Sequence, residues 1–424
     1  MRRSEYGSMA WLLLLVWICA GCTEENNCYQ PDPEPSVAQF AGSQTCGSSA
    51  CHSTIYTQWS QSGHPYKVVK IEGEAPSGKF PEFSAYPNDP IDPPQNKTWS
   101  DVTYTIGGFY WKMRWLDENG YVMTSGAGEL DAQYNFETEA YTTYHTDNEP
   151  GTKPYDCGQC HTTGWVADDD AASDGDLNDN QDGLEGIHGT FFAGGIHCEE
   201  CHGKGSLHAG NPSGFDMVVD PSSALCGRCH TRDPLNRIAA SNGFIRHHEQ
   251  YDEWRHSPHG IAGGPGCNGC HDPHASVVFD DTAEGTGVTA ACTDCHDAAD
   301  YALENHNSLP SCTDCHMPQA AKSAVNSTPY DGDVTSHIWA INTDPVGKEE
   351  GMGILPDGSS FVKVDSQTGL ARLTLDFVCY RCHNDTNGQG GGGSELPLSV
   401  LSAVAEGMHP VSSRKSKSNE VAAQ

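Results

Sequence analysis

The chain has few basic residues. Its 424 residues include 23 Lys and Arg against 57 Asp and Glu, which gives a formal net charge of −34 at pH 7. An electrostatic field of that sign repels nucleic acid and attracts metal ions and basic proteins. Nucleic-acid binding is therefore excluded.

Apolar side chains are scarce as well. Hydrophobic residues make up 36% of the chain, which also contains 46 Gly and 25 Pro, and this composition is thin for the conventional cores of a chain of this length. The apolar run at residues 11–18 is too short to span a membrane. Something other than side chains must fill the interior.

Cysteine, by contrast, is abundant and follows one pattern. Of the 19 Cys, sixteen form eight pairs, and each pair is directly followed by His. A thioredoxin-like dithiol, a zinc knuckle or a disulfide framework also uses paired Cys, but none of these requires that His. In covalent c-type haem attachment the two thiols form thioethers to the porphyrin, and the His supplies an axial imidazole to the iron. Seven pairs have two residues between the thiols and the first pair has four: Cys46/Cys51/His52, Cys157/Cys160/His161, Cys198/Cys201/His202, Cys226/Cys229/His230, Cys267/Cys270/His271, Cys292/Cys295/His296, Cys312/Cys315/His316 and Cys379/Cys382/His383.

The pattern predicts eight covalently attached haem c groups. Their apolar faces would serve as the core, with the polypeptide wrapped around them. The expected fold class is mostly irregular, with short α-helices around c-type haems. The exception is a small β insert near residues 99–124, where β-branched and aromatic residues on both sides of Gly107 and Gly108 predict a hairpin.

The N-terminus predicts export. In residues 1–21, Arg2 and Arg3 precede the apolar run, as in a secretory signal peptide. Cys22 resembles the acylated Cys of a bacterial lipobox, so we expect residues 22–39 to be a lipid-anchored tether at the outer membrane, facing the periplasm or the cell exterior. The alternative is cleavage further along the chain, which would leave Cys22 and Cys28 free to pair.

Residues 40–65 carry a family resemblance. Cys51-His52 is followed by Tyr56-x-x-Trp59 and then by Ser62-x-His64. This segment resembles the cytochrome c554-like multihaem family, although the four-residue spacer departs from the family's usual two. The resemblance implies a helix with a Tyr-x-x-Trp face and a distal haem ligand at His64. Residues 40–166 are therefore interpreted as an N-terminal haem region of this type, which includes the β insert.

The same Tyr-Trp-Ser-His spacing recurs at Tyr251, Trp254, Ser257 and His259, so the chain uses the arrangement twice. Of 21 His, eight belong to the motifs and thirteen remain. Iron with two His ligands is coordinatively saturated, so it passes electrons and does not bind substrate. The resemblance favours the following distal ligands: His64, His145, His208, His248, His259, His274, His306 and His337.

Residues 167–187 form an acidic loop. Six of its side chains have the spacing of calcium ligands, namely Asp174, Asp176, Asn178, Asn180, Asp182 and Glu185, although Asp179 stands where the sharp turn needs Gly. The alternative is a solvated acidic loop. Residues 188–384 are interpreted as a multihaem core, and residues 385–424 as a Gly-rich linker and polar tail.

These features predict an exported octahaem cytochrome that transfers electrons along a chain of bis-His haems, in respiratory or extracellular electron transfer. Its partners would be other redox proteins or extracellular electron acceptors, and no haem would bind substrate. Two alternatives stay open. A multihaem oxidoreductase acting on small nitrogen or sulfur compounds needs an open iron, which related enzymes often mark with Cys-x-x-Cys-Lys, and this chain has no such motif. A subunit of a conductive cytochrome filament needs self-assembly.

Overall fold

The computed structural model describes residues 37–86, 91–128, 130–168, 179–233, 235, 237–279, 286–297, 303, 306, 310–383 and 396–409. Residues 39–424 form one compact unit, and residues 1–38 form another. The predicted signal peptide, the Cys22 anchor and most of the tether lie outside the described residues. Within the described ranges, no helix is both long and apolar enough to cross a membrane.

The helices are short, as the composition predicts. Helices of this length are marginal by themselves and depend on packing against the rest of the fold. Irregular chain with short helices and a small β insert was the fold class expected from the sequence, and it is confirmed. The helices in the described part of the chain are α1 Ser43–Cys46, α2 Ser53–Ser60, α3 Gly158–His161, α4 Cys198–His202, α5 Ser206–Gly210, α6 Ser223–Gly227, α7 Gln250–Arg255, α8 Pro258–Ile261, α9 Cys312–His316, α10 Lys348–Gly351, α11 Leu375–Cys379 and α12 Leu398–Ala405.

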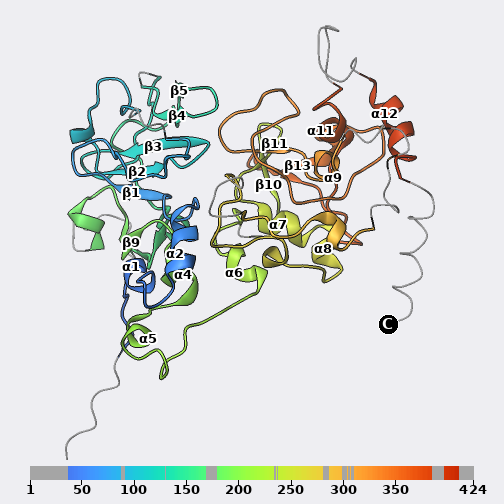
Figure 1. Ribbon diagram of the computed structural model, residues 1–424. Helices are drawn as coiled ribbons and strands as arrows, with labels where there is room; N and C mark the ends of the chain where they lie inside the picture. The colour runs from blue at the N-terminus through green and yellow to red at the C-terminus, as the bar shows by residue number, and fades with distance from the viewer. Residues whose placement is uncertain are drawn as a thin grey trace, which may run out of the picture. The chain divides into compact units, whose positions relative to one another are not determined.

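The predicted hairpin is the centre of an antiparallel sheet of five strands, which lie side by side in Figure 1. Gly107 and Gly108 have φ values of 76° and 108°, a backbone conformation that glycine adopts without strain. Met113 and Trp115 are fully buried on the hairpin's core side. The sheet extends well beyond the predicted insert, with strand order β1 Val68–Lys70, β2 Tyr104–Gly107, β3 Lys112–Leu116, β4 Gln133–Asn135 and β5 Ala140–Thr142.

A second five-stranded sheet was not predicted. Its strands have two or three residues each, too few to show an alternating pattern in the sequence. Ile245, Ile338 and Leu373 belong to the apolar cluster that packs around it. Its strand order is β12 Ala321–Lys322, β11 Phe244–Arg246, β10 Ala239–Ser241, β14 Ser360–Val362 and β13 Met352–Ile354; two small pairs join β6 Thr162–Thr163 to β9 Ala193–Gly194 and β7 Val166–Ala167 to β8 Gly189–Thr190.

The C-terminal segment differs from the predicted linker and tail. Helix α12 lies within it, and Leu401 on that helix is buried against Leu375 and Tyr380. Apolar side chains at Leu398, Leu401 and neighbouring positions explain why this part of the segment packs instead of staying solvated.

Candidate haem sites and their axial imidazoles

The motifs fold so that the His returns to the first Cys. In four regular motifs the backbone N–H of the His donates to the carbonyl of the first Cys, at 2.9 Å from His230 to Cys226, for example. The widened motif closes in the same way, because His52 N donates to Cys46 O at 2.9 Å. The two extra residues of its spacer therefore leave this closing contact intact. All sixteen motif thiols are free of disulfides and available for thioether formation.

Cys295 is one of the motif thiols that lie exposed at the surface. The cause is local: Cys295 follows a single 3-10 turn, η5 Cys292–Asp294, and its backbone N donates to Cys292 O at 3.3 Å. Because a thioether joins the rim of the porphyrin and not its face, a surface thiol is still able to form one. The attachment of haem to Cys295 stays a prediction. The other exposed motif thiols are Cys51, Cys157, Cys201, Cys292, Cys312 and Cys382.

The two copies of the Tyr-Trp-Ser-His arrangement have the same local structure at Tyr, Trp and Ser and differ at His. Tyr56 packs on Gly47 and Tyr251 on Gly227, each the residue after the first Cys of a motif, where an added Cβ would lie 2.2 Å and 2.6 Å from the ring. In both copies the Ser hydroxyl donates to the Trp carbonyl, at 2.8 Å for Ser62 and 2.6 Å for Ser257. The aromatic pair therefore packs on a motif turn.

Seven of the eight motif imidazoles face a second imidazole. Two metal–nitrogen bonds of about 2 Å each, plus the half-widths of two rings, place ring centroids roughly 6 Å apart when both rings bind one metal. The described pairs have centroid separations close to this value: His52 and His208 at 6.4 Å, His202 and His274 at 6.3 Å, His230 and His248 at 5.9 Å, His271 and His337 at 6.1 Å, His296 and His259 at 6.1 Å, His316 and His409 at 6.0 Å, and His383 and His306 at 6.0 Å. The residues present therefore fit seven six-coordinate haems.

Six of the eight expected distal ligands belong to these pairs, and His64 and His145 do not. His64 Nδ1 faces the carbonyl of Pro273 at 3.2 Å, and His145 Nδ1 faces Asp147 at 3.5 Å. The sequence analysis missed His409, which is the partner of His316. No local signal marks His409, because it follows α12 in a segment without a haem motif.

Neighbouring motifs meet through their thiols. Cys160 and Cys229 interact, and each thiol also donates to a backbone carbonyl of the other motif, at 3.9 Å to Arg228 and 3.7 Å to Gln159. Thiols of the other motifs lie close enough to interact electrostatically: Cys46 with Cys198, Cys201 with Cys226, Cys226 with Cys267, Cys270 with both Cys292 and Cys295, Cys292 with Cys312, and Cys315 with Cys382.

These contacts arrange the motifs in an order. Seven of them form a series, which runs through His52, His202, His230, His271, His296, His316 and His383. The motif of His161 joins the series as a side branch at the motif of His230. The seven motifs in series are the same seven whose imidazoles are paired.

The imidazole of His161 has no partner ring among the described residues. Its Nδ1 is buried without a hydrogen bond. His64 is an expected distal ligand without a paired ring, and its backbone lies close to that of His161. The neighbouring residues Ile196 and Gly195 donate their backbone N–H groups to His64 O and His161 O, respectively. The His64 side chain nevertheless turns to Pro273. This geometry differs from the expectation that every iron is saturated.

The charges of four cations act on His161. Desolvation, followed by the charges of Lys67, Arg114, Arg232 and Lys112, lowers the pKa of His161 to about 3. Such a concentration of positive charge is unusual in a chain with a net charge of −34. The site is therefore electrostatically suited to an anion.

Three of these cations are held in place by neighbours. The Arg114 guanidinium donates to Gln133 Oε1 at 2.5 and 2.8 Å and lies 3.7 Å from the centroid of the Tyr144 ring. Arg232 contacts His247 Nε2 at 3.3 Å, and Lys112 donates to the carbonyl of Ser323. Lys67 is half-buried; its ammonium group makes no hydrogen bond or ion pair to a described residue, and desolvation lowers its pKa.

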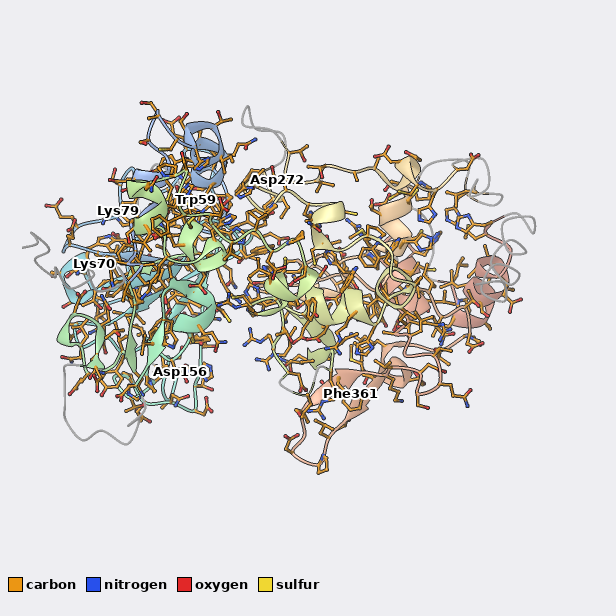
Figure 2. All side chains as sticks on the ribbon, turned by 90° about the horizontal axis from the view of Figure 1, so that it is seen from below. Trp59, Lys70, Lys79, Asp156, Asp272 and Phe361 are labelled. Carbon is orange, nitrogen blue, oxygen red and sulfur yellow. The ribbon has the colours of Figure 1, made fainter. Side chains whose placement is uncertain are left out.

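The acidic loop gives the calcium interpretation no support in its described half. Asp182 accepts hydrogen bonds from Lys70 Nζ at 2.6 Å and from Tyr104 OH at 2.5 Å, and Lys70 is labelled in Figure 2. Asn180 donates its side-chain amide to Ile187 O. Asp174, Asp176 and Asn178 lie outside the described residues. Where the structure describes the chain, no three His, Cys, Asp or Glu side chains gather in a way that could hold a metal ion.

Comparisons with known proteins point to one class. Residues 256–301 match the doubled CXXCH motif family. The dissimilatory sulfite reductase MccA of Wolinella succinogenes is 24% identical over 249 residues, which cover 44% of this chain and 33% of that protein. The C-type polyheme cytochrome OmcB of Geobacter sulfurreducens is 30% identical over 134 residues, 32% of this chain and 17% of OmcB. The multiheme cytochrome MtrA of Shewanella baltica is 25% identical over 175 residues, 35% of this chain and 46% of MtrA.

A solved structure supports the fold. The octaheme sulfite reductase MccA of Wolinella succinogenes superposes with a TM-score of 0.54 and 20% sequence identity, over 88% of this chain and 71% of that chain. The matched regions span less than half the length of each of the three curated relatives. The likeness to the solved structure therefore describes the fold.

Proposed function

We propose that this chain, which is a multihaem c-type cytochrome, carries electrons along a series of seven bis-His haems. The seven imidazole pairs, at 5.9 to 6.4 Å between centroids, are the observation that carries the proposal. Haem c, when bound, supplies an iron that takes up and releases one electron. The chain's own residues hold and orient it: two Cys and a proximal His fix each group, and the distal His closes the sixth position. Partners would be redox proteins or extracellular acceptors.

The path would run between the motifs of His52 and His383, because the thiol contacts connect the motifs in that order. The widened first motif belongs to this path, since its His52 both closes on Cys46 and faces His208. We therefore propose eight haems in total, with that of His161 on a branch. Kinship with cytochrome c554-like proteins rests on residues 40–65 and is part of the proposal.

Haem stoichiometry and spin state test this proposal. Intact mass should show eight covalent haems, and electron paramagnetic resonance should show seven low-spin irons and one high-spin iron, that of His161. His64→Ala should leave this ratio unchanged because His64 faces Pro273. Eight low-spin irons in the wild type, with one turning high-spin in His64→Ala, would instead make His64 the sixth ligand that the family resemblance implies.

We also propose that the protein is anchored in the outer membrane through acylated Cys22. The support is the lipobox-like sequence before Cys22, which lies outside the described residues. Labelled palmitate should enter the wild type and not Cys22→Ser. Cys28→Ser is the matched control, because it removes the neighbouring thiol and should keep the label. Equal labelling of all three proteins would contradict the anchor.

A second function is favoured by the surroundings of His161. His161 would hold an iron from one side, next to Lys67, Lys112, Arg114 and Arg232. With no second imidazole, such an iron would be able to bind a small oxyanion and to receive electrons from the series at His230. The similarity to a dissimilatory sulfite reductase agrees with a sulfur or nitrogen oxyanion. Sulfite or nitrite should change the high-spin signal alone; no change with either anion would remove this second function and leave the first.

A further inference from the structure

Asp272 contacts the ring of a distal His through its carboxylate. Asp272 directly follows His271 and lies two residues before His274 (it is labelled in Figure 2). Its Oδ1 accepts two hydrogen bonds from His274, one from the backbone N and one from Nδ1, each at 2.9 Å. The Nδ1 of His274 is therefore engaged, which leaves Nε2 for the iron shared with His202.

Other paired imidazoles meet neutral acceptors. His202 Nδ1 donates to the carbonyl of Val218 at 2.7 Å, and His208 Nδ1 to that of Phe215 at 2.7 Å. His316 Nδ1 donates to the carbonyl of Trp339 at 2.8 Å. Among the paired rings whose Nδ1 contact the structure describes, that of His274 faces a full negative charge.

We propose that Asp272 is a positioning residue that gives the haem of His202 and His274 the lowest reduction potential in the series. The inference rests on the proposed axial ligation. A carboxylate that accepts from the Nδ1–H of a metal-bound imidazole raises the basicity of the ligating nitrogen. A more basic ligand stabilises the oxidised iron, and second-shell hydrogen bonding is one of the means by which a protein sets a haem potential. The contact also fixes the plane of His274, which lies 2° from that of His202.

The position of this pair in the series gives the effect a function. The motif of His202 lies between that of His52 and the branch at His230. A low potential there means that transfer of an electron onto this haem is the least favourable step in either direction along the series. The haem of His52 would consequently exchange electrons with the haems beyond this site more slowly than the separations between the haems alone predict.

The test is a redox titration followed by electron paramagnetic resonance. When the two axial imidazole planes are nearly parallel, the energies of the iron dxz and dyz orbitals separate and the low-spin signal is rhombic. Nearly perpendicular planes do not give this rhombic signal. The pair of His202 and His274 belongs to the parallel class, as do the pairs at 13° and 15°. His274→Ala identifies its signal, because that signal alone should turn high-spin.

The Asp272 variants then report on the contact. In the wild type the identified signal should be the last to disappear on reduction. Its midpoint potential should rise in Asp272→Asn, which keeps an oxygen acceptor without charge, rise further in Asp272→Ala, and return towards the wild-type value in Asp272→Glu. Asp294→Asn is the matched control, because Asp294 lies within a haem motif but contacts the backbone N of Ala291 and no imidazole. It should leave the identified potential unchanged.

Two failures are distinguishable. If His274→Ala converts one haem to high spin but the Asp272 variants move no potential, the inference on Asp272 is wrong and the axial ligation stands. If His274→Ala leaves every iron low-spin, His274 is not a ligand and the proposed pairing itself is wrong. A shift of equal size in Asp294→Asn would reduce the effect of Asp272 to general negative charge near the haems.

Discussion

Lys67→Gln should weaken the binding of sulfite or nitrite at the His161 site by roughly 10- to 150-fold, the loss expected for one charge-assisted hydrogen bond of about 1.5–3 kcal/mol. Lys67 is suited to this test because no described residue bonds to its ammonium group, so the substitution breaks no hydrogen bond or ion pair to the described part of the chain. The measurement is a titration of the high-spin signal with the anion.

The pH dependence of the same titration has a defined sign. Desolvation lowers the pKa of both Lys67 and Lys112. Only the protonated lysine attracts an anion, so the affinity of the site for the anion should fall as pH rises. Because the two pKa values are lowered, this fall should occur at a lower pH than it would with ordinary lysines. It should be smaller in Lys67→Gln, which lacks one of the two titrating groups. Lys97→Gln is the control, since Lys97, which is also half-buried, pairs with Glu118 Oε2 at 3.6 Å and is not one of the cations at His161. Equal weakening by both substitutions would mean that overall charge alone governs binding.

Replacing Cys226 and Cys229 by Ser should divide the electron path into three unconnected parts. The thiols of the His230 motif interact with thiols of the His202, His161 and His271 motifs, so losing its haem should separate these three neighbours from one another. When fully reduced protein is mixed with an oxyanion that accepts electrons only at His161, the wild type should be reoxidised throughout. In the double variant only the branch haem should be reoxidised rapidly, and the others should slow by orders of magnitude.

Cys312→Ser with Cys315→Ser is the matched control for this experiment. It also removes one haem, but that haem is the last connection before the motif of His383. Only the haem of His383 should then be left behind. If the same number of haems stays reduced in both double variants, the order inferred from the thiol interactions is wrong. Reoxidation that stays complete and fast in both would mean that each haem reacts with the acceptor directly.

Covalent chemistry made the attachment sites predictable from the sequence. A Cys-His motif is local, so a few consecutive residues suffice to predict where a haem would be bound, and the closing hydrogen bond of His52 gives the widened copy the same local geometry. How deeply a thiol such as Cys295 lies in the fold is not part of that local information. The hairpin around Gly107 and Gly108 is local in the same sense as the motifs. The sheet that contains β11 escaped prediction because its strands are very short, and because β10 pairs with β14, whose residues lie more than a hundred positions further along the chain.

Sixth ligands are set by the whole fold, and local pattern does not determine them. His64 and His259 end the same Tyr-Trp-Ser-His arrangement, with the same Ser-to-Trp hydrogen bond, yet His259 faces His296 while His64 faces Pro273. The cations at His161 illustrate the same point. Lys67 and Arg232 come from segments with no shared motif and converge only because the fold brings them to one imidazole.

The branched order of the motifs also bears on how many electrons can be delivered together. A site at the end of a wire receives electrons one at a time, and a substrate that needs several of them must wait as a partly reduced species. The His161 motif instead joins the series near its middle, with two motifs on one side of the junction and four on the other. If the proposed ligation holds, the seven saturated haems would be reduced beforehand and would then pass electrons into the branch from both sides. Such an arrangement favours completing a multi-electron reduction in a single visit, so that reactive intermediates are not released.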